Sequence, residues 1–114
     1  MLFRSGIPPQ FNDGSGTQVG TLCRAWVQFV GSSAVINASF NVSSVTRSAA
    51  GQYLVNFTNA MPDSKYSAST SCYYVTSVLN YVSLYPAPTA SAVGVTCYIG
   101  GYFDPNIYNV AIFR

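Results

Sequence analysis

The side chains that most often carry out catalysis are scarce in this chain. It contains no histidine and no glutamate, and its only carboxylate side chains belong to Asp13, Asp63 and Asp104. Without histidine, neither a Ser-His-Asp nor a Cys-His relay can form within the chain. Hydrolysis of a glycosidic bond usually needs two carboxylates roughly 5–10 Å apart, and only distant aspartates or neighbouring chains could supply such a pair. We therefore expect that the protein is not an enzyme.

Two of the aspartates lie beside prolines. Asp63 follows Pro62 and Asp104 precedes Pro105, and aspartate next to proline is typical of turns. The simplest interpretation gives both residues a structural role in a turn. The alternative is contact with a ligand or with a bound cation.

The three cysteines, Cys23, Cys72 and Cys97, are widely separated. An odd number at this spacing is not a disulfide framework, and three distant cysteines without histidine do not match a zinc site. Each lies in an apolar, strand-like run, where a free cysteine behaves as a small hydrophobic residue. We expect three buried, unpaired thiols, no metal and no cofactor.

Tyrosine is the positive signal for binding. The chain has nine tyrosines, and tyrosine combined with serine, asparagine and glycine is also the composition of antibody binding loops. Tyrosine favours strands as well, so we interpret strand tyrosines such as Tyr53 as contributors to folding. Binding residues concentrate on loops that a rigid scaffold supports. The candidate ligand-binding residues are therefore Tyr85 in loop 85–89 and Tyr102, Asp104 and Asn106 in loop 100–106.

Both candidate loops contain proline. Proline limits the conformations that a loop loses on binding and so lowers the entropic cost. The Asp104 and Asn106 side chains offer hydrogen bonds to sugar hydroxyls. If the domain binds a glycan, we expect the contacts to come from these two loops.

The elements that must position these loops are β-strands. Apolar residues alternate with polar ones at a period of two, as in Ala25, Val27 and Phe29 against Arg24 and Trp26, and no useful helical stripe is present. Two such runs around a turn that ends in glycine predict a hairpin over residues 42–58. The expected strands are residues 22–30, 42–46, 52–58, 66–74, 78–85, 92–99 and 107–113. This pattern predicts an all-β fold, an antiparallel β-sandwich knob of about seven or eight short strands.

Residues 1–20 differ from the rest of the chain. Pro8 and Pro9 disfavour both helix and strand pairing, and residues 12–16 are turn-forming. We expect an extended arm over residues 1–20, running along a neighbour or connecting to something upstream, and a single knob domain over residues 21–114. The start of the chain lacks the apolar core of a secretory signal, so we expect that the protein is assembled in a host cytoplasm or that the chain is a fragment of a longer protein.

The composition favours a component of an assembly. Hydrophobic residues make up 49% of the chain and charged residues 7%, against about 25% charged residues in an average protein. Such a surface is better suited to burial against other subunits than to a free monomer. We expect a homotrimer in which the inward faces of several strands form an apolar three-fold core.

Two classes of partner are not expected. The net charge is only +2 and the basic residues are scattered, whereas nucleic-acid binding requires a clustered basic stripe. The uncharged stretch between Lys65 and Asp104 is interrupted by Pro86 and Pro88. A membrane-spanning helix needs about 20 predominantly apolar residues in a row, so membrane insertion is not expected either.

Several segments resemble a module found near the C-terminus of many bacteriophage tail-fibre and tail proteins. The motifs are an Ala-Trp-Val-x-Phe opening at residues 25–29 and a Val-Asn-Phe-Thr-x-Ala-Met-Pro-Asp run at residues 55–63. The resemblance covers roughly residues 20–66 and, for the closing strand, 107–113. It departs from the module at residues 30–34, where an Asn-Gly-Thr-type turn and then a basic residue are usual, and residues 67–106 match no module.

The resemblance implies a trimeric knob at the C-terminus of a tail fibre, with loops that touch the host surface. Its partners would be other virion tail proteins and a host-surface glycan or outer-membrane receptor. The alternative is a structural virion protein without a ligand of its own, either a head decoration protein or a knob that trimerises a fibre. The N-terminal arm and the initiator methionine of the chain favour this alternative.

Overall fold

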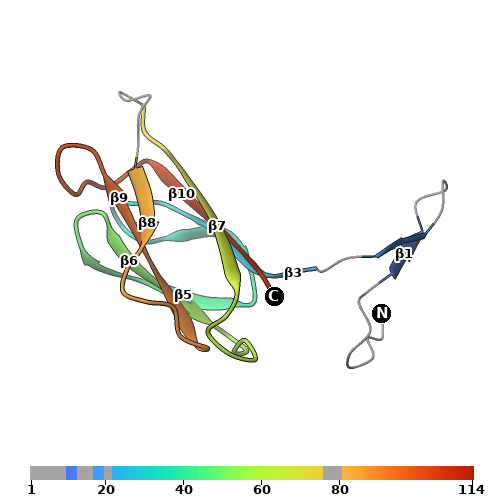
Figure 1. Cartoon of the computed structure of the whole chain (residues 1–114). Coiled ribbons are helices and arrows are strands. Elements are labelled where there is room, and N and C mark those ends of the chain that lie inside the picture. Colours follow the sequence, from blue (N-terminus) through green and yellow to red (C-terminus); the bar gives the residue numbers. More distant parts are fainter. Residues whose placement is uncertain (1–9, 13–16, 20–21, 76–80) are drawn as a thin grey trace.

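The structure, a computed structural model, describes residues 10–12, 17–19, 22–75 and 81–114. Two four-stranded antiparallel sheets pack face to face, and a short two-stranded hairpin precedes them (Figure 1). The predicted all-β sandwich is confirmed. The part of the chain that the structure describes contains no helix long and apolar enough to cross a membrane.

The two sheets have simple strand orders. In the first sheet the order is β4-β3-β10-β7, and in the second it is β5-β6-β9-β8. The strands of the first sheet are β3 (Cys23–Phe29), β4 (Ile36–Phe40), β7 (Ser67–Tyr73) and β10 (Ile107–Phe113). Those of the second are β5 (Val42–Ala49), β6 (Gln52–Phe57), β8 (Tyr81–Leu84) and β9 (Ala92–Tyr98).

Two of these strands differ from the sequence-based expectation. β4 is a strand that the period-two pattern does not predict separately, and it completes the first sheet as an edge strand beside β3. The strand expected over residues 78–85 corresponds to β8, and its first three residues, 78–80, lie outside the described residues.

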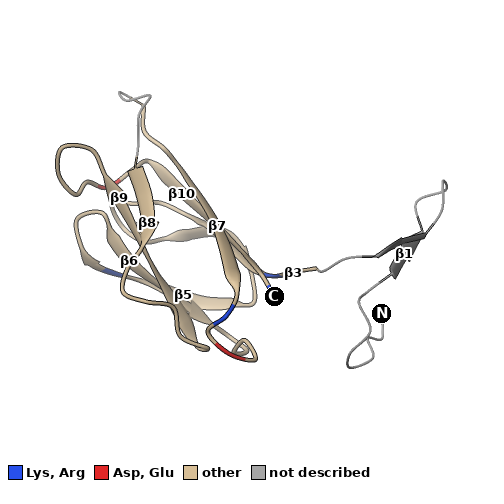
Figure 2. Cartoon of the chain, in the orientation of Figure 1, with Lys and Arg blue, Asp and Glu red and all other residues tan. Residues whose placement is uncertain are grey.

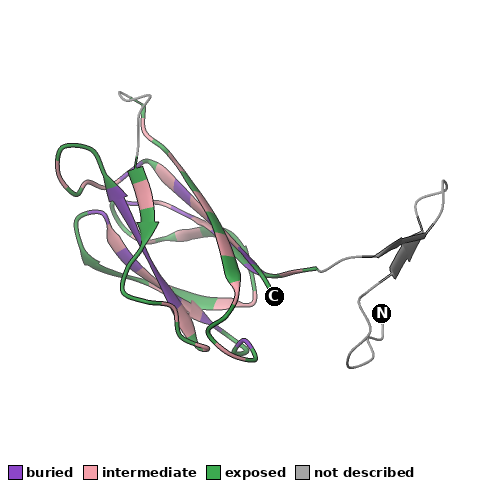
Figure 3. Ribbon diagram, viewed as in Figure 1, coloured by how far each residue is buried: buried purple, intermediate pink, exposed green. Residues whose placement is uncertain are grey.

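The core lies between the sheets and follows the period-two pattern. Buried positions alternate along β3, β6 and β10 (Figure 3). Three buried rings meet toward one end of this core: Phe29 stacks on Tyr108 at 5.4 Å between ring centroids, and Tyr53 meets both rings edge-on. Aromatic pairs in these geometries stabilise a core beyond their area burial. Tyr53 is buried, which is consistent with its interpretation as a contributor to folding.

The antiparallel registers define two ends of the sandwich. Cys23 at the start of β3 lies opposite Phe113 at the end of β10, so the chain enters and leaves the sandwich at one end, here called the proximal end. The opposite or distal end carries the β5–β6 turn, the loop of residues 99–106 and the start of β8 (Figure 1). Loops at the same end of the sandwich can contribute to one binding site, whereas loops at opposite ends cannot.

The expected arm, residues 1–20, lies mostly outside the described residues. Its described parts are β1 (Gln10–Asn12) and β2 (Thr17–Val19), which pair with each other antiparallel. The extended arm over the whole of residues 1–20 therefore stays a prediction.

The prediction that all three cysteines are buried is wrong for two of them. Cys97 on the interior strand β9 is fully buried, whereas Cys23 and Cys72 are half-buried. Cys23 begins β3 at the proximal end, and Cys72 lies on β7, which is an edge strand of its sheet in the described part of the chain. The three thiols are free, as predicted.

The expected location of a trimer core also needs correction. The inward apolar faces of the strands pack against each other within one chain. If the chain forms a trimer, its interface must therefore use surfaces other than these inner faces. Those surfaces carry few charges: most of the ribbon of both sheets bears neither acidic nor basic residues (Figure 2).

Candidate functional site

The structure divides the four predicted site residues between the two ends of the sandwich. Tyr102, Asp104 and Asn106 lie together in the distal loop that joins β9 to β10. Tyr85 follows β8, whose first residue Tyr81 is paired with Tyr98 near the distal end and whose last is paired with Val95. Tyr85 therefore lies toward the proximal end, and the two candidate loops do not form one site.

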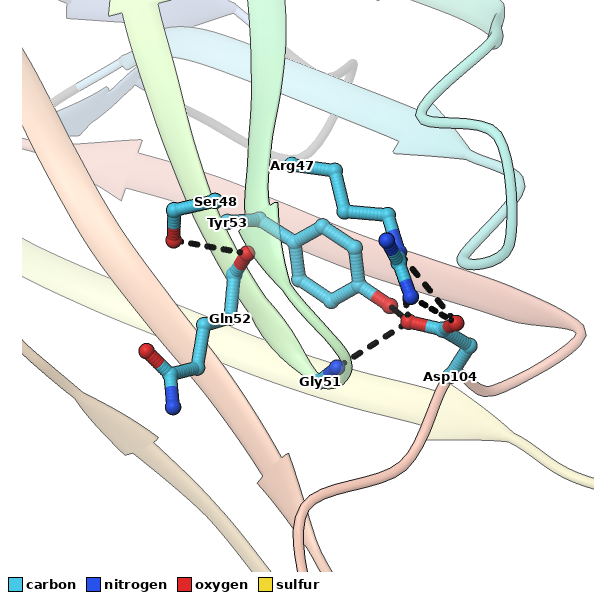
Figure 4. A network of polar contacts seen from close by, with 6 residues as sticks. All are labelled: Arg47, Ser48, Gly51, Gln52, Tyr53 and Asp104. Atoms are coloured by element: carbon cyan, nitrogen blue, oxygen red, sulfur yellow. Dashed lines mark hydrogen bonds and ion pairs between the residues drawn. The ribbon is translucent and has the colours of Figure 1, made fainter.

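Asp104 anchors the distal loop to the β5–β6 hairpin (Figure 4). Its carboxylate oxygens accept two hydrogen bonds from Arg47 Nε, at 3.0 and 3.2 Å, and one from Arg47 Nη2 at 2.7 Å. Oδ1 also accepts hydrogen bonds from the Tyr53 hydroxyl at 2.7 Å and from the Gly51 amide at 3.0 Å. The structural role predicted for Asp104 is therefore to tie the distal loop to Arg47 on β5, to Tyr53 on β6 and to the turn between these two strands.

The electrostatics of this network favour the ionised carboxylate. Partial burial raises the pKa of Asp104, but the hydrogen bonds from Arg47, Gly51 and Tyr53 outweigh burial and leave the pKa below its usual value. The hydrogen bond to Asp104 raises the pKa of the Arg47 guanidinium. Burial, with the hydrogen bond to Asp104, raises the pKa of Tyr53 well above its usual range. All three groups therefore keep their charge states at neutral pH.

Backbone contacts fix the rest of the distal loop. Gly51 has a φ of +66° and lies so close to the loop that an added Cβ would be 2.5 Å from the Cys97 carbonyl oxygen and 2.6 Å from that of Phe103. The Phe103 amide donates to the Cys97 carbonyl. Asn106 is also engaged, because its Oδ1 accepts a hydrogen bond from the Val75 amide at 3.0 Å. The polar side chains proposed for sugar binding are thus used in holding the loop.

Three exposed tyrosines gather beside this anchored loop. Tyr81 on β8 and Tyr98 on β9 are directly opposite in the register, and Tyr98 forms a β-bridge with Tyr102. The Tyr98 and Tyr102 rings meet edge to face, with centroids 5.4 Å apart. Tyr81, Tyr98 and Tyr102 are 66%, 44% and 51% exposed. We call these three residues the distal tyrosine cluster.

Sequence reasoning identifies Tyr102 but misses Tyr81 and Tyr98. Both lie on strands, where tyrosine commonly fills a sheet face. They remain exposed because they sit at the distal ends of β8 and β9, and β8 is an edge strand of its sheet. A period-two count alone could have placed Tyr98 on the face opposite to that of Val95 and Cys97, but it could not have paired Tyr98 with Tyr81.

The proximal end has a separate hollow. A pocket of 660 Å³ lies where the chain enters the sandwich, and its lining includes Leu22, Phe40, Asn59, Met61 and Arg114. Arg114 forms an ion pair with Asp63 at 3.0 Å, and Asp63 also accepts a hydrogen bond from the Lys65 amide. The predicted turn at Asp63 is thereby tied to the last residue of the chain.

The described residues do not bring the usual catalytic groups together. Asp63 is at the proximal end and Asp104 at the distal end, and each is engaged in an ion pair. Among these residues, no three His, Cys, Asp or Glu side chains are grouped as a metal site would need. No protein-family model, curated protein or solved structure was found to match the chain.

Proposed function

We propose that this chain is the tip domain of a bacteriophage tail fibre, which acts as a trimer and binds a glycan on the host surface through the distal tyrosine cluster. The observation that carries the proposal is the position of this cluster at the end opposite to that where the chain enters and leaves the sandwich. A fibre attached through the N-terminal arm would join the proximal end and leave Tyr81, Tyr98 and Tyr102 facing outward.

The chemistry of the cluster suits a shallow glycan site. Tyrosine offers a large, rigid apolar surface together with a hydroxyl group. Tyr102 sits on a loop that Asp104 holds in place, so little conformational freedom is lost when a ligand binds. The binding is proposed to involve no catalysis, because the carboxylate of the same loop, Asp104, is already occupied by three partners within the domain.

The test is binding of the purified protein to an array of bacterial surface glycans and to host cells. Tyr102→Ala and Tyr98→Ala should each weaken glycan binding at least about tenfold, since loss of a central aromatic contact typically costs more than about 1.4 kcal/mol. Their melting temperatures should stay close to that of the parent, because both side chains are about half exposed.

Two control variants make this test specific. Tyr85→Ala removes a tyrosine that is at least as exposed and lies toward the proximal end, and it should leave binding unchanged. Tyr53→Ala removes a buried ring and should lower the melting temperature. If binding survives Tyr98→Ala and Tyr102→Ala but is lost with Tyr85→Ala, the binding site lies at the proximal end. Binding to host cells that persists after removal of their glycans would point to a protein receptor.

A structural virion protein is the second candidate. The observation that favours it is an exposed apolar pair on the outer face of the first sheet. Trp26 and Phe40 are directly opposite in the register and are 40% and 57% exposed. Such a pair suits contacts between subunits, and a trimer that binds neither host cells nor glycans would support this role.

A further inference from the structure

Two cysteines from opposite sheets meet at one side of the sandwich. Cys72 belongs to the edge strand β7 of the first sheet, and Cys97 to β9 of the second. Their sulfur atoms are 3.0 Å apart. A disulfide bond is about 2.05 Å long, so the two sulfurs would need to approach by only about 1 Å to form one.

The two thiols differ in accessibility. Cys97 is fully buried, whereas Cys72 is half-buried on an edge strand. Burial, with the hydrogen bond to Cys72, raises the pKa of the Cys97 thiol above its usual range. An external reagent can therefore reach Cys72 first, whereas Cys97 is more deeply buried and stays a protonated thiol.

Cys23 does not belong to this pair. Along β10, Cys72 lies opposite Tyr108 and Cys23 opposite Phe113. Five residues of strand separate these two positions, which is about 17 Å. The Cys23 thiol instead donates to the Ala25 carbonyl at 3.2 Å, and the chain thus provides an internal control cysteine.

We propose that Cys72 and Cys97 form a reversible redox pair that closes to an inter-sheet disulfide when the protein meets a low-molecular-weight disulfide such as oxidised glutathione. The Cys72 thiolate attacks one glutathione sulfur, forms a mixed disulfide and releases one glutathione thiolate. The Cys97 sulfur then attacks the Cys72 sulfur and releases the second glutathione thiolate, which takes up the Cys97 proton. The two protein thiols lose two electrons, and one oxidised glutathione becomes two reduced molecules.

The crosslink would fasten the two sheets to each other. It closes the chain between residues 72 and 97, which includes the whole of β8, and so restricts the unfolded state. Each cysteine directly precedes an exposed tyrosine, Tyr73 or Tyr98. The disulfide would thus hold together the two strands that carry these tyrosines to the distal end. This inference concerns the fold and does not depend on the proposed glycan binding.

The experiment is titration of the native full chain with oxidised glutathione, followed by intact mass, peptide mapping without reduction and thermal unfolding. We expect a mass loss of about 2 Da per chain, corresponding to two hydrogen atoms, and a crosslinked Cys72–Cys97 peptide. The melting temperature should rise by about 10 °C and return to its initial value with dithiothreitol. The Cys23→Ser variant should behave in the same way.

Cys72→Ser and Cys97→Ser should show neither the mass loss nor the rise in melting temperature. If either variant fails to fold, peptide mapping of the parent and of Cys23→Ser is sufficient to test whether the Cys72–Cys97 disulfide forms. A stable mixed disulfide with glutathione, a crosslink that includes Cys23, or three thiols that remain reduced in the folded protein would each overturn the proposal.

Discussion

At the scale of single residues, Asp104 determines how the distal loop is held. Its carboxylate lies between the guanidinium of Arg47, the amide of Gly51 and the hydroxyl of Tyr53. Because Tyr53 is buried, loss of its acceptor would leave a polar group without a partner inside the protein. The same residue thus connects the core to the surface that carries Tyr102.

We predict that Asp104→Ala lowers the free energy of unfolding by about 3 kcal/mol, because it leaves a buried hydroxyl and a backbone amide unsatisfied. Asp104→Asn keeps an acceptor but loses the charge, and should lie between Asp104→Ala and the parent. Urea unfolding measures both. The matched control is Asp63→Ala, which removes a more exposed ion pair and should cost clearly less stability than Asp104→Ala. Equal losses at the two positions would contradict the anchoring role of Asp104.

Two glycines, Gly51 and Gly100, allow the cost of backbone strain to be measured separately from the cost of steric crowding. Gly51 and Gly100 have nearly the same positive φ, +66° and +64°, but an added Cβ would meet backbone atoms only at Gly51. We predict that Gly100→Ala costs about 1 kcal/mol of stability, the cost of the left-handed conformation alone. Gly51→Ala should cost at least about 3 kcal/mol, because the distal loop must also move. Thermal unfolding of the two variants side by side measures the difference, and similar melting temperatures would refute it.

At the scale of elements, the first crossing of the chain between the two sheets, from β4 to β5, depends on one residue. Asn41 links β4 of the first sheet to β5 of the second with a φ of +57°. Its Nδ2 donates to the carbonyls of Arg24 and Asn59, and its Oδ1 accepts a hydrogen bond from the Asn59 amide. Asparagine tolerates this backbone conformation better than most residues.

We predict a definite order of stability at this corner: parent, then Asn41→Gly, then Asn41→Ala. Asn41→Gly retains the backbone conformation and loses the side-chain hydrogen bonds, at a cost of about 1–2 kcal/mol. Asn41→Ala adds roughly 1 kcal/mol of left-handed strain. Chemical denaturation of the three proteins gives the order, and an alanine variant as stable as the glycine variant would show that backbone strain is not involved.

At the scale of the whole molecule, the scarcity of ionisable side chains controls the response to pH. The chain has no histidine and no glutamate, so few groups titrate between about pH 5 and pH 8. The bidentate pairing with Arg114, with a hydrogen bond from the Lys65 amide, lowers the pKa of Asp63 to about 2. The pKa of Asp104 is lowered as well.

We predict that stability is nearly constant from about pH 5 to pH 8 and falls on both sides. Below about pH 4, the unfolded chain binds protons at Asp63 and Asp104 that the folded chain does not bind, so stability decreases toward about pH 2. Burial raises the pKa of Cys97, Tyr53 and Tyr108. Above about pH 8.5, the unfolded chain releases protons that these buried groups retain, so stability decreases again. Melting temperatures measured across this range test both limbs.

The oligomeric state is the second prediction at this scale. We expect a trimer whose interface includes the outer face around Trp26 and Phe40, because the inner faces already form the core of each chain. Native mass spectrometry at micromolar concentration should show three chains in the parent. The double variant with Trp26→Ser and Phe40→Ser should dissociate and remain folded. A parent that is monomeric would refute the trimer.

The local sequence pattern is sufficient to predict the class of the fold and the inner face of its main strands. Alternation of apolar and polar residues is a property of neighbouring positions, and it correctly assigns Ala25, Val27 and Phe29 of β3 and Tyr53 of β6 to the core. The β5–β6 hairpin is predictable for the same reason, since its two strands are neighbours in the chain. Proline, glycine and tyrosine identify the candidate loops.

Which of these residues meet depends on the packing of the whole chain. Asp104 contacts Arg47 and Tyr53, both more than fifty residues away, and Cys72 meets Cys97 across two sheets. Tyr81 joins Tyr98, whereas Tyr85 lies toward the opposite end. The reason is that strand order and register arise from tertiary packing, and the period-two pattern of a strand is the same whichever neighbour it has.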